Sequence, residues 1–151
     1  TASTTLSVTD AKALTTANTD AITIALSDAA NTTVQASDLT TITGKTSATV
    51  TLSNAATISG NESEVTAAIV TGGTKVAFSN QSAITVTGSI TADATNITKL
   101  KNIQSAAGGA VTATIASGTY AVINGNRINT RIEAKSARTP NSLLGIARRI
   151  A

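Results

Sequence analysis

The stretches ITIALSD (residues 22–28), ATVTLSN (48–54) and TKVAFSN (74–80) follow one another at intervals of 26 residues, without a gap. Ile24, Val50 and Val76 occupy the same position in this alignment. A spacing of this length is typical of repeat proteins, in which each unit buries its apolar side against the next unit. We therefore expect a repeat protein whose equivalent apolar side chains align along one core.

Apolar residues alternate with polar ones in each of these stretches and again near residue 113, which predicts strands with one face toward the core. The strands are expected at 22–26, 48–52, 76–78 and 111–115, and shorter extended pieces at 32–34, 57–59 and 84–87. Asp28, Asn54 and Asn80 follow the strands at equivalent positions, where polar side chains can stack as a ladder. A further strand, TYAVIN, is expected at 119–124.

Short helical turns are expected between the extended pieces, because helix-capping residues recur there. Asn61 and Glu64 have the spacing of a capping box, in which two side chains satisfy free amides of the first helical turn. Thr9–Asp10, Ser37–Asp38 and Thr91 with Asp93 are further candidates for caps. The longest helix is expected from about Asp93 to Gln104.

The composition favours a thin aliphatic core: 41% of the residues are hydrophobic, but only 1% are aromatic. Thr, Ser and Asn suit half-exposed strands and corners. The expected fold class is mainly β with short helices (an α+β repeat), namely a short β-solenoid of 26-residue units plus a helical, non-repeat C-terminal tail. The body is expected at residues 1–124 and the tail at 125–151. A disordered Ser/Thr linker is the alternative for the whole chain.

Charge separates the tail from the body. Residues 1–118 contain five Lys against seven Asp and Glu, a net charge of −2, whereas residues 119–151 contain six Lys and Arg against one Glu, a net charge of +5. Apolar residues lie between the cations, so the tail is expected to dock on an acidic protein surface. The predicted partner-binding residues are Arg127, Ile128, Arg131, Ile132, Leu143, Leu144, Ile146, Arg148, Arg149 and Ile150. The alternative is a tail that is only solvated and binds no partner.

No catalytic, cofactor or metal site is predicted. Glu62, Glu64 and Asp93 could form a carboxylate pair for glycan hydrolysis, but acids are also expected at helix starts. The chain has no His or Cys, which excludes the usual nucleophilic triads and thiolate metal sites. Residues 44–47, GKTS, resemble the end of a phosphate-binding loop, yet Leu39 replaces the first glycine that such a loop needs.

Membrane and nucleic-acid partners are not expected. No apolar run approaches the 18 residues of a membrane span. Six cations over 33 residues, with no aromatic residue beyond Tyr120, are sparse for a nucleic-acid site.

The sequence of residues 36–69 is ASDLTTITGKTSATVTLSNAATISGNESEVTAAI. It resembles the Thr/Ala/Asn-rich repeats of surface proteins of marine cyanobacteria and of structural proteins of their phages. With the small size and the basic tail, the chain is similar to the knob-like capsid decoration proteins of marine cyanophages. This resemblance implies a non-enzymatic virion protein on the capsid exterior, whose partner is the major capsid protein or another virion lattice protein. The alternative is a fragment of a host-binding tail fibre or of a bacterial adhesin or surface-layer protein, which is extracellular or at the cell surface and binds host glycans.

Overall fold

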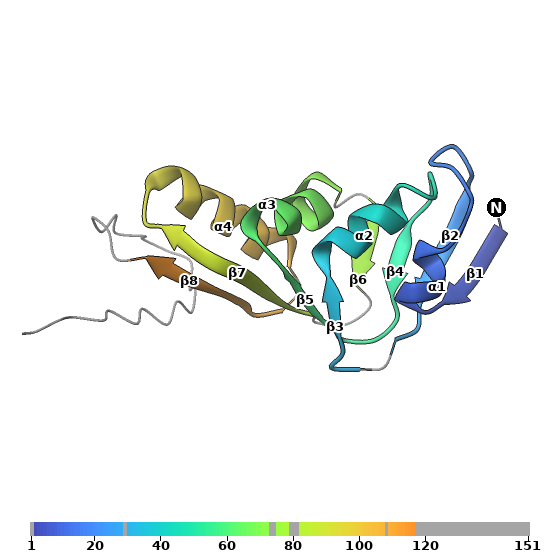
Figure 1. Cartoon of the computed structure of the whole chain (residues 1–151), viewed down its shortest axis with the longest axis horizontal. Coiled ribbons are helices and arrows are strands. Elements are labelled where there is room, and N and C mark those ends of the chain that lie inside the picture. The colour runs from blue at the N-terminus through green and yellow to red at the C-terminus, as the bar shows by residue number, and fades with distance from the viewer. Residues whose placement is uncertain (1, 29, 73–74, 79–81, 108, 117–151) are drawn as a thin grey trace, which may run out of the picture.

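The computed structural model describes residues 2–28, 30–72, 75–78, 82–107 and 109–116. Within these residues the chain forms two four-stranded parallel β-sheets, and a row of short helices runs alongside them (Figure 1). The described part is elongated, with β1 at one end and β8 at the other.

Sheet A has the strand order β1-β2-β4-β6, and its register aligns the apolar residues that the sequence placed at one position. Ile24 lies beside Val50, and Val50 lies beside Val76, which confirms this alignment. Leu26 and Leu52 are paired two residues further on. The strands are β1 (Ala2–Leu6), β2 (Ile22–Leu26), β4 (Val50–Leu52) and β6 (Val76–Phe78).

Sheet B has the order β3-β5-β7-β8 and aligns Val34, Ile58, Ile84 and Val111 in the same way. The register of β7 against β8 shifts between Val86 and Ser89. The strands are β3 (Thr33–Gln35), β5 (Thr57–Gly60), β7 (Ala83–Thr91) and β8 (Val111–Ala116).

Helices connect the strands: α1 (Val8–Lys12), α2 (Ala36–Thr43), α3 (Glu62–Val65) and α4 (Ala94–Ala106). A π-helical segment, η1 (Thr66–Thr71), continues α3. The capping box of Asn61 and Glu64 is confirmed, and Asp93 caps α4 by accepting a hydrogen bond from the Asn96 amide at 2.8 Å. The other two expected caps were wrong: Ser7 caps α1, and Gln35 precedes α2 without a side-chain cap.

Helix α2 forms although its sequence, ASDLTTIT, is rich in β-branched threonine, which favours strands over helices. The Thr40 and Thr41 hydroxyls donate to the carbonyls of Ala36 and Ser37, four residues earlier, at 3.3 and 3.0 Å. Leu39 and Ile42, one turn apart, are both fully buried. Packing of this apolar face therefore outweighs the weak helix propensity of the segment.

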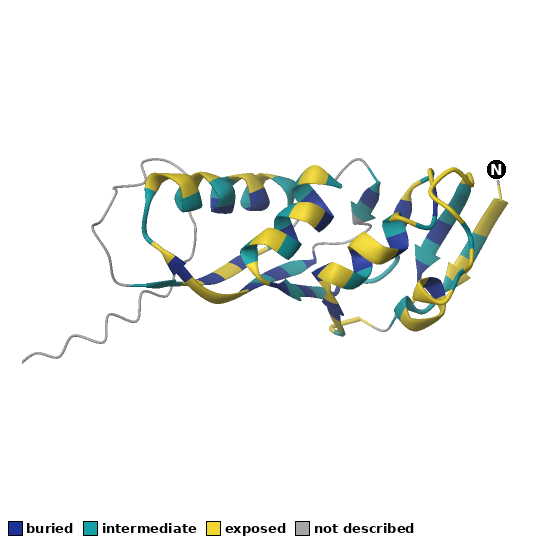
Figure 2. Cartoon of the chain, turned by 45° about the horizontal axis from the view of Figure 1, so that its top comes forward, coloured by how far each residue is buried: buried dark blue, intermediate teal, exposed yellow. Residues whose placement is uncertain are grey.

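The core lies between the two sheets and the helix row, and the outward sides of the helices are exposed (Figure 2). It is aliphatic, as the composition predicts. Its largest fully buried apolar side chains are Ile24, Leu39, Ile42, Val50, Ile58, Val65, Ile69, Ile84, Leu100 and Ile103. The expected stack of corner side chains is not seen between Asp28 and Asn54: the Asn54 side-chain amide donates to the Asp28 backbone carbonyl at 2.8 Å, and the Asp28 carboxylate accepts from the Val8 amide at 2.9 Å. Asn80 lies outside the described residues.

The expected fold class was wrong. The described residues do not form a mainly β solenoid of 26-residue units; they form an α/β fold of two small parallel sheets with short helices. The physical reason is that segments such as Ala36–Thr43 and Ala94–Ala106 bury an apolar face as helices, so the helices form a third side of the core. The predicted strand at 119–124, the boundary at 124/125 and the helical tail lie outside the described residues.

Candidate functional site

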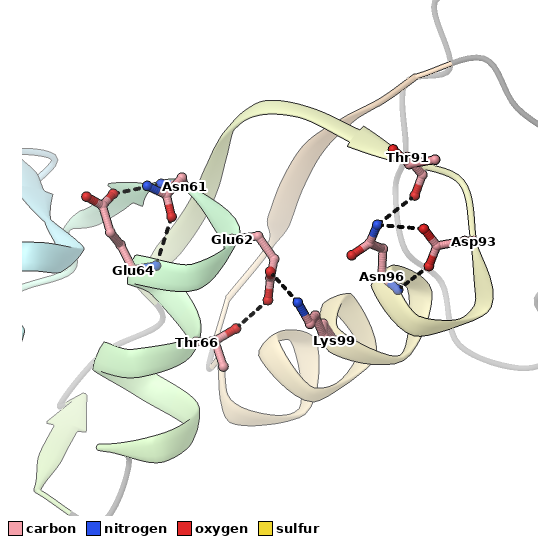
Figure 3. A network of polar contacts seen from close by, with 8 residues as sticks. All are labelled: Asn61, Glu62, Glu64, Thr66, Thr91, Asp93, Asn96 and Lys99. Carbon is pink, nitrogen blue, oxygen red and sulfur yellow. Dashed lines mark hydrogen bonds and ion pairs between the residues drawn. The ribbon is translucent and has the colours of Figure 1, made fainter.

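The ten residues predicted to bind a partner fall between Arg127 and Ile150, outside the described residues. Their role stays a prediction. The acidic residues considered above as a possible catalytic group lie in the described part. Glu62 and Glu64 are in α3, and Asp93 immediately precedes α4 (Figure 3). Their contacts decide what chemistry they can perform.

Glu62 joins α3 to α4. Its Oε2 lies 2.9 Å from Lys99 Nζ, and its Oε1 accepts a hydrogen bond from the Thr66 hydroxyl at 2.8 Å. Burial by itself raises the pKa of the Glu62 carboxyl, but the hydrogen bonds from Lys99 and Thr66 and the positive charge of Lys99 outweigh it and hold the pKa below its ordinary value. A general acid needs a raised pKa, so this carboxylate is suited to an ion pair rather than to proton donation.

Glu64 and Asp93 have structural partners as well. Glu64 accepts a hydrogen bond from the Asn61 amide at 2.9 Å, and its own amide donates to Asn61 at 3.0 Å. Asp93 accepts from both the backbone and the side-chain amide of Asn96 at 2.8 Å. Figure 3 shows two separate sets of contacts: Asn61 with Glu64 at the start of α3, and Asp93 with Asn96 at the start of α4. The arrangement stabilises helix starts.

The segment Gly44–Ser47 is a corner between α2 and β4. Gly44 ends α2. Thr46 is fully buried, and its hydroxyl lies within hydrogen-bond distance of the carbonyls of Asp20 and Ile22 and accepts from the amides of Ile22 and Ala48. A phosphate loop directs its backbone amides at a ligand, whereas Thr46 here ties the start of β2 to the approach to β4.

Two further lysines support the helix row. Lys12 on α1 forms an ion pair with Asp38 on α2 at 2.7 Å. The Lys75 ammonium donates to the carbonyls of Thr43 and Thr46, at 3.4 and 3.0 Å, near the end of α2. A cation is favourable there because the last carbonyls of a helix carry partial negative charge.

Within the described ranges, every buried side-chain nitrogen or oxygen has a hydrogen-bond partner, and no three His, Cys, Asp or Glu residues lie close enough to hold a metal ion. The helices of this part are also too short or too polar to cross a membrane.

One strand of sheet A, the edge strand β1, was not predicted from the sequence. Its sequence, ASTTL, contains one large apolar residue, which is a weak strand signal. The alternation of Thr4 and Leu6, which lie beside Ile24 and Leu26, is the signal that could have found it.

The search for similar proteins gives no further guide to a site. Comparison of the chain with models of protein families, with curated proteins and with solved structures finds no match.

Proposed function

We propose that this chain is a non-enzymatic structural protein of a virion, which decorates or protrudes from a phage capsid and is held there by its C-terminal tail. The observation that carries the proposal is the position of the last described strand. The last described strand, β8, lies at the opposite end of the elongated body from β1 (Figure 1). A tail that continues from this end and binds a lattice leaves the other end of the body pointing away.

The charge distribution supports docking of the tail on an acidic surface. The chain up to residue 118 has a net charge of −2, and the remaining residues have +5. The predicted anchors include both Arg and Ile or Leu residues, which combines long-range attraction with apolar burial at the contact. The major capsid protein or another protein of the virion lattice is the proposed partner.

The acidic side chains of the body support a structural role. Glu62, Glu64 and Asp93 are used to join or cap helices, and the pKa of Glu62 is lowered. The Glu62–Lys99 ion pair joins α3 to α4, and Glu64 and Asp93 stabilise the starts of their own helices, which a rigid projection needs.

The proposal is tested by incorporation into particles. A full-length, epitope-tagged chain is expressed during infection of the host, and purified virions are examined by immunogold electron microscopy. We expect gold on the capsid for the full chain and none for a chain lacking residues 126–151. Circular dichroism of that shortened chain checks that the body remains folded.

Charge provides the matched control. The pair Arg131→Glu and Arg148→Glu should abolish incorporation, whereas Arg131→Lys and Arg148→Lys should largely retain it, because lysine keeps the charge. Incorporation of the shortened chain would refute the tail as the anchor. Gold on tail fibres or on the host surface would instead favour the host-binding fibre or adhesin.

A further inference from the structure

The two sheets are displaced from each other by one strand. Three pairs of consecutive strands, β2–β3, β4–β5 and β6–β7, pass directly from sheet A into sheet B. β1 lies beyond the first pair, in sheet A alone, and β8 lies beyond the last pair, in sheet B alone. Within the described residues, sheet A therefore extends one strand further than sheet B at the end that holds β1. At the opposite end sheet B extends one strand further, and no described strand lies beside the free edge of β6.

The edge strands lack the two side-chain features that most often prevent pairing with another chain, although β3 and β6 are only three residues long and the pairing of β7 with β8 contains a register shift. Exposed edges are commonly protected by charged residues or by proline. The four edge strands contain neither: their sequences are ASTTL (β1), TVQ (β3), VAF (β6) and VTATIA (β8).

The backbone groups of β1 and β6 match across such a junction. The Leu6 carbonyl accepts from the Ser27 amide at 2.9 Å, so the groups of Leu6 face β2 and those of Ser3 and Thr5 face the free edge. The Lys75 carbonyl accepts from the Val50 amide, so the groups of Val76 face the free edge of β6. A strand β1 of a second copy, with its Thr4 beside Val76, can accept from the Val76 amide through Ser3 and donate to the Val76 carbonyl through Thr5.

In sheet B, the free edge of β8 in one copy matches the free edge of β3 in the next copy, when the two copies are placed as for β6 and β1. The Thr57 amide donates to the Thr32 carbonyl at 2.8 Å, which leaves the groups of Thr33 and Gln35 facing the free edge of β3. The Ile84 amide donates to the Ala110 carbonyl at 2.8 Å, so the groups of Val111 face the free edge of β8. Val34 of a second copy then continues the row that Val111 ends.

Some apolar side chains at the two ends are incompletely covered, although Val34, Val76 and Val111 on the edge strands are buried. Ile24 and Leu26, inside sheet A, are 0% and 3% exposed, whereas Leu6, beside Leu26 on the edge strand, is only partly buried. Partly buried apolar residues of the same kind lie at both ends: Leu6, Val8 and Leu14 at one, and Ala106, Ala107 and Ile115 at the other. Burying them against each other is favourable.

We propose that copies of this chain associate head to tail, with β1 of one copy pairing with β6 of the next and β3 pairing with β8, so that both sheets continue. The two surfaces differ, so the association is heterologous and extends as a filament rather than closing as a dimer. The four strands that pair across the junction all lie within the described residues, and their pairing does not depend on the proposed virion role.

The position beside β6 is better suited to a second copy than to the apolar segment 119–124 of the same chain. In this fold a strand of sheet B reaches the next strand of sheet A through a helix, as β5 reaches β6 through α3 and η1. Residue 119 follows the end of β8 by three residues, which span at most about 11 Å. Elsewhere this return from sheet B to sheet A is made by α2, between β3 and β4, or by α3 with η1, between β5 and β6.

Disulfide trapping in the full-length chain tests the proposal, because the natural sequence has no cysteine. Thr5 and Ala77 occupy equivalent positions on the outer face of sheet A, so Thr5→Cys and Ala77→Cys together place two thiols beside each other across the junction. Within one copy the two positions are three strand spacings apart, about 14 Å, beyond the reach of a disulfide.

Mild oxidation of the double-cysteine chain should give a ladder of multiples of 15.0 kDa on a non-reducing gel. Each single-cysteine chain should give nothing larger than a dimer. A double-cysteine chain that stays at the mass of one copy, or that stops at the dimer, overturns the proposal.

Proline provides a second test that leaves the body intact. Thr5→Pro and Gln35→Pro remove amides that face the free edges, and Gln35 already has φ −72°, which proline adopts. In sedimentation analysis the parent chain and the control with Thr5→Ala and Gln35→Ala should increase in mass with concentration, whereas the double-proline chain should remain at 15.0 kDa. A parent chain that stays monomeric at all concentrations, or proline variants that associate as the parent does, would contradict head-to-tail pairing.

Discussion

Replacing Thr46 by valine distinguishes a structural corner from a ligand loop at Gly44–Ser47. Valine has nearly the shape of threonine, so Thr46→Val removes the hydroxyl without opening a cavity. Thr46 is fully buried, so water cannot take the place of its hydroxyl, although the partner residues Ile22 and Ala48 are half-buried. The expected result is a large loss of stability in a variant whose side-chain volume is almost unchanged.

The hydrogen bonds of Thr46 set the magnitude. Its Oγ1 accepts from the Ala48 amide at 2.9 Å and from the Ile22 amide at 3.1 Å, and it donates to a carbonyl of Asp20 or Ile22. The Ile22 amide keeps an alternative acceptor, the Asp20 carbonyl at 3.0 Å. The Ala48 amide loses its acceptor, and an unsatisfied buried group costs about 1–3 kcal/mol. With the lost donation to a carbonyl, we expect a destabilisation of about 2–3 kcal/mol.

The free energy of unfolding is measured by urea denaturation followed by circular dichroism, because the chain has no tryptophan for fluorescence. The thermal midpoint should fall by roughly 10 °C. Thr43→Val is the matched control: its hydroxyl donates only to the Thr40 carbonyl, and its loss should cost less than about 0.5 kcal/mol. The structural interpretation fails if Thr46→Val is as stable as the parent, or if Lys45→Ala is equally destabilising.

Two further substitutions test a contact in the middle of α4 and a contact of the turn that follows it. Glu62→Gln should lower the free energy of unfolding by about 0.5–1 kcal/mol at neutral pH, a small value because Lys99 is 43% exposed. Since the pKa of Glu62 is lowered in the folded state, this difference should disappear as acid protonates the carboxylate of the parent chain. A difference that does not depend on pH would exclude the ion pair as its source. Gly109→Ala places a Cβ 2.5 Å from the Ser82 carbonyl oxygen and should cost about 2–3 kcal/mol in the same urea assay. Gly88→Ala meets no atom within 4 Å but keeps φ +81°, so it should cost less, about 1–2 kcal/mol; the reverse order would contradict the packing at Ser82.

The sequence predicted the strands and their partners better than the fold class. Alternation located the apolar residues of β2, β4, β6 and β8, and the constant spacing predicted that Ile24, Val50 and Val76 would lie side by side. Capping chemistry located the starts of α3 and α4, because Asn61 and Asp93 satisfy amides within their own first turns. These are local or strictly periodic signals.

The remaining features depend on contacts that the sequence does not show. Thr-rich segments suggested a mainly β fold, but Leu39 and Ile42 bury one side of α2 and make it helical. β1 was missed because its strand character comes from pairing with β2 rather than from its own composition. The Glu62–Lys99 ion pair joins residues 37 positions apart and follows from the packing of α3 beside α4.

The proposed anchoring and the proposed stacking make different demands on the end of the body at β8. A chain held to a lattice through residues 125–151 presents β1 outward, so further copies would add there through their own β6 and β8 edges. Those edges lie before residue 117, and removal of residues 126–151 leaves them in place. The shortened chain should therefore lose incorporation into virions and keep head-to-tail association. If it loses both, the tail itself contributes to the junction, and the match of β1 with β6 is not sufficient to hold two copies together.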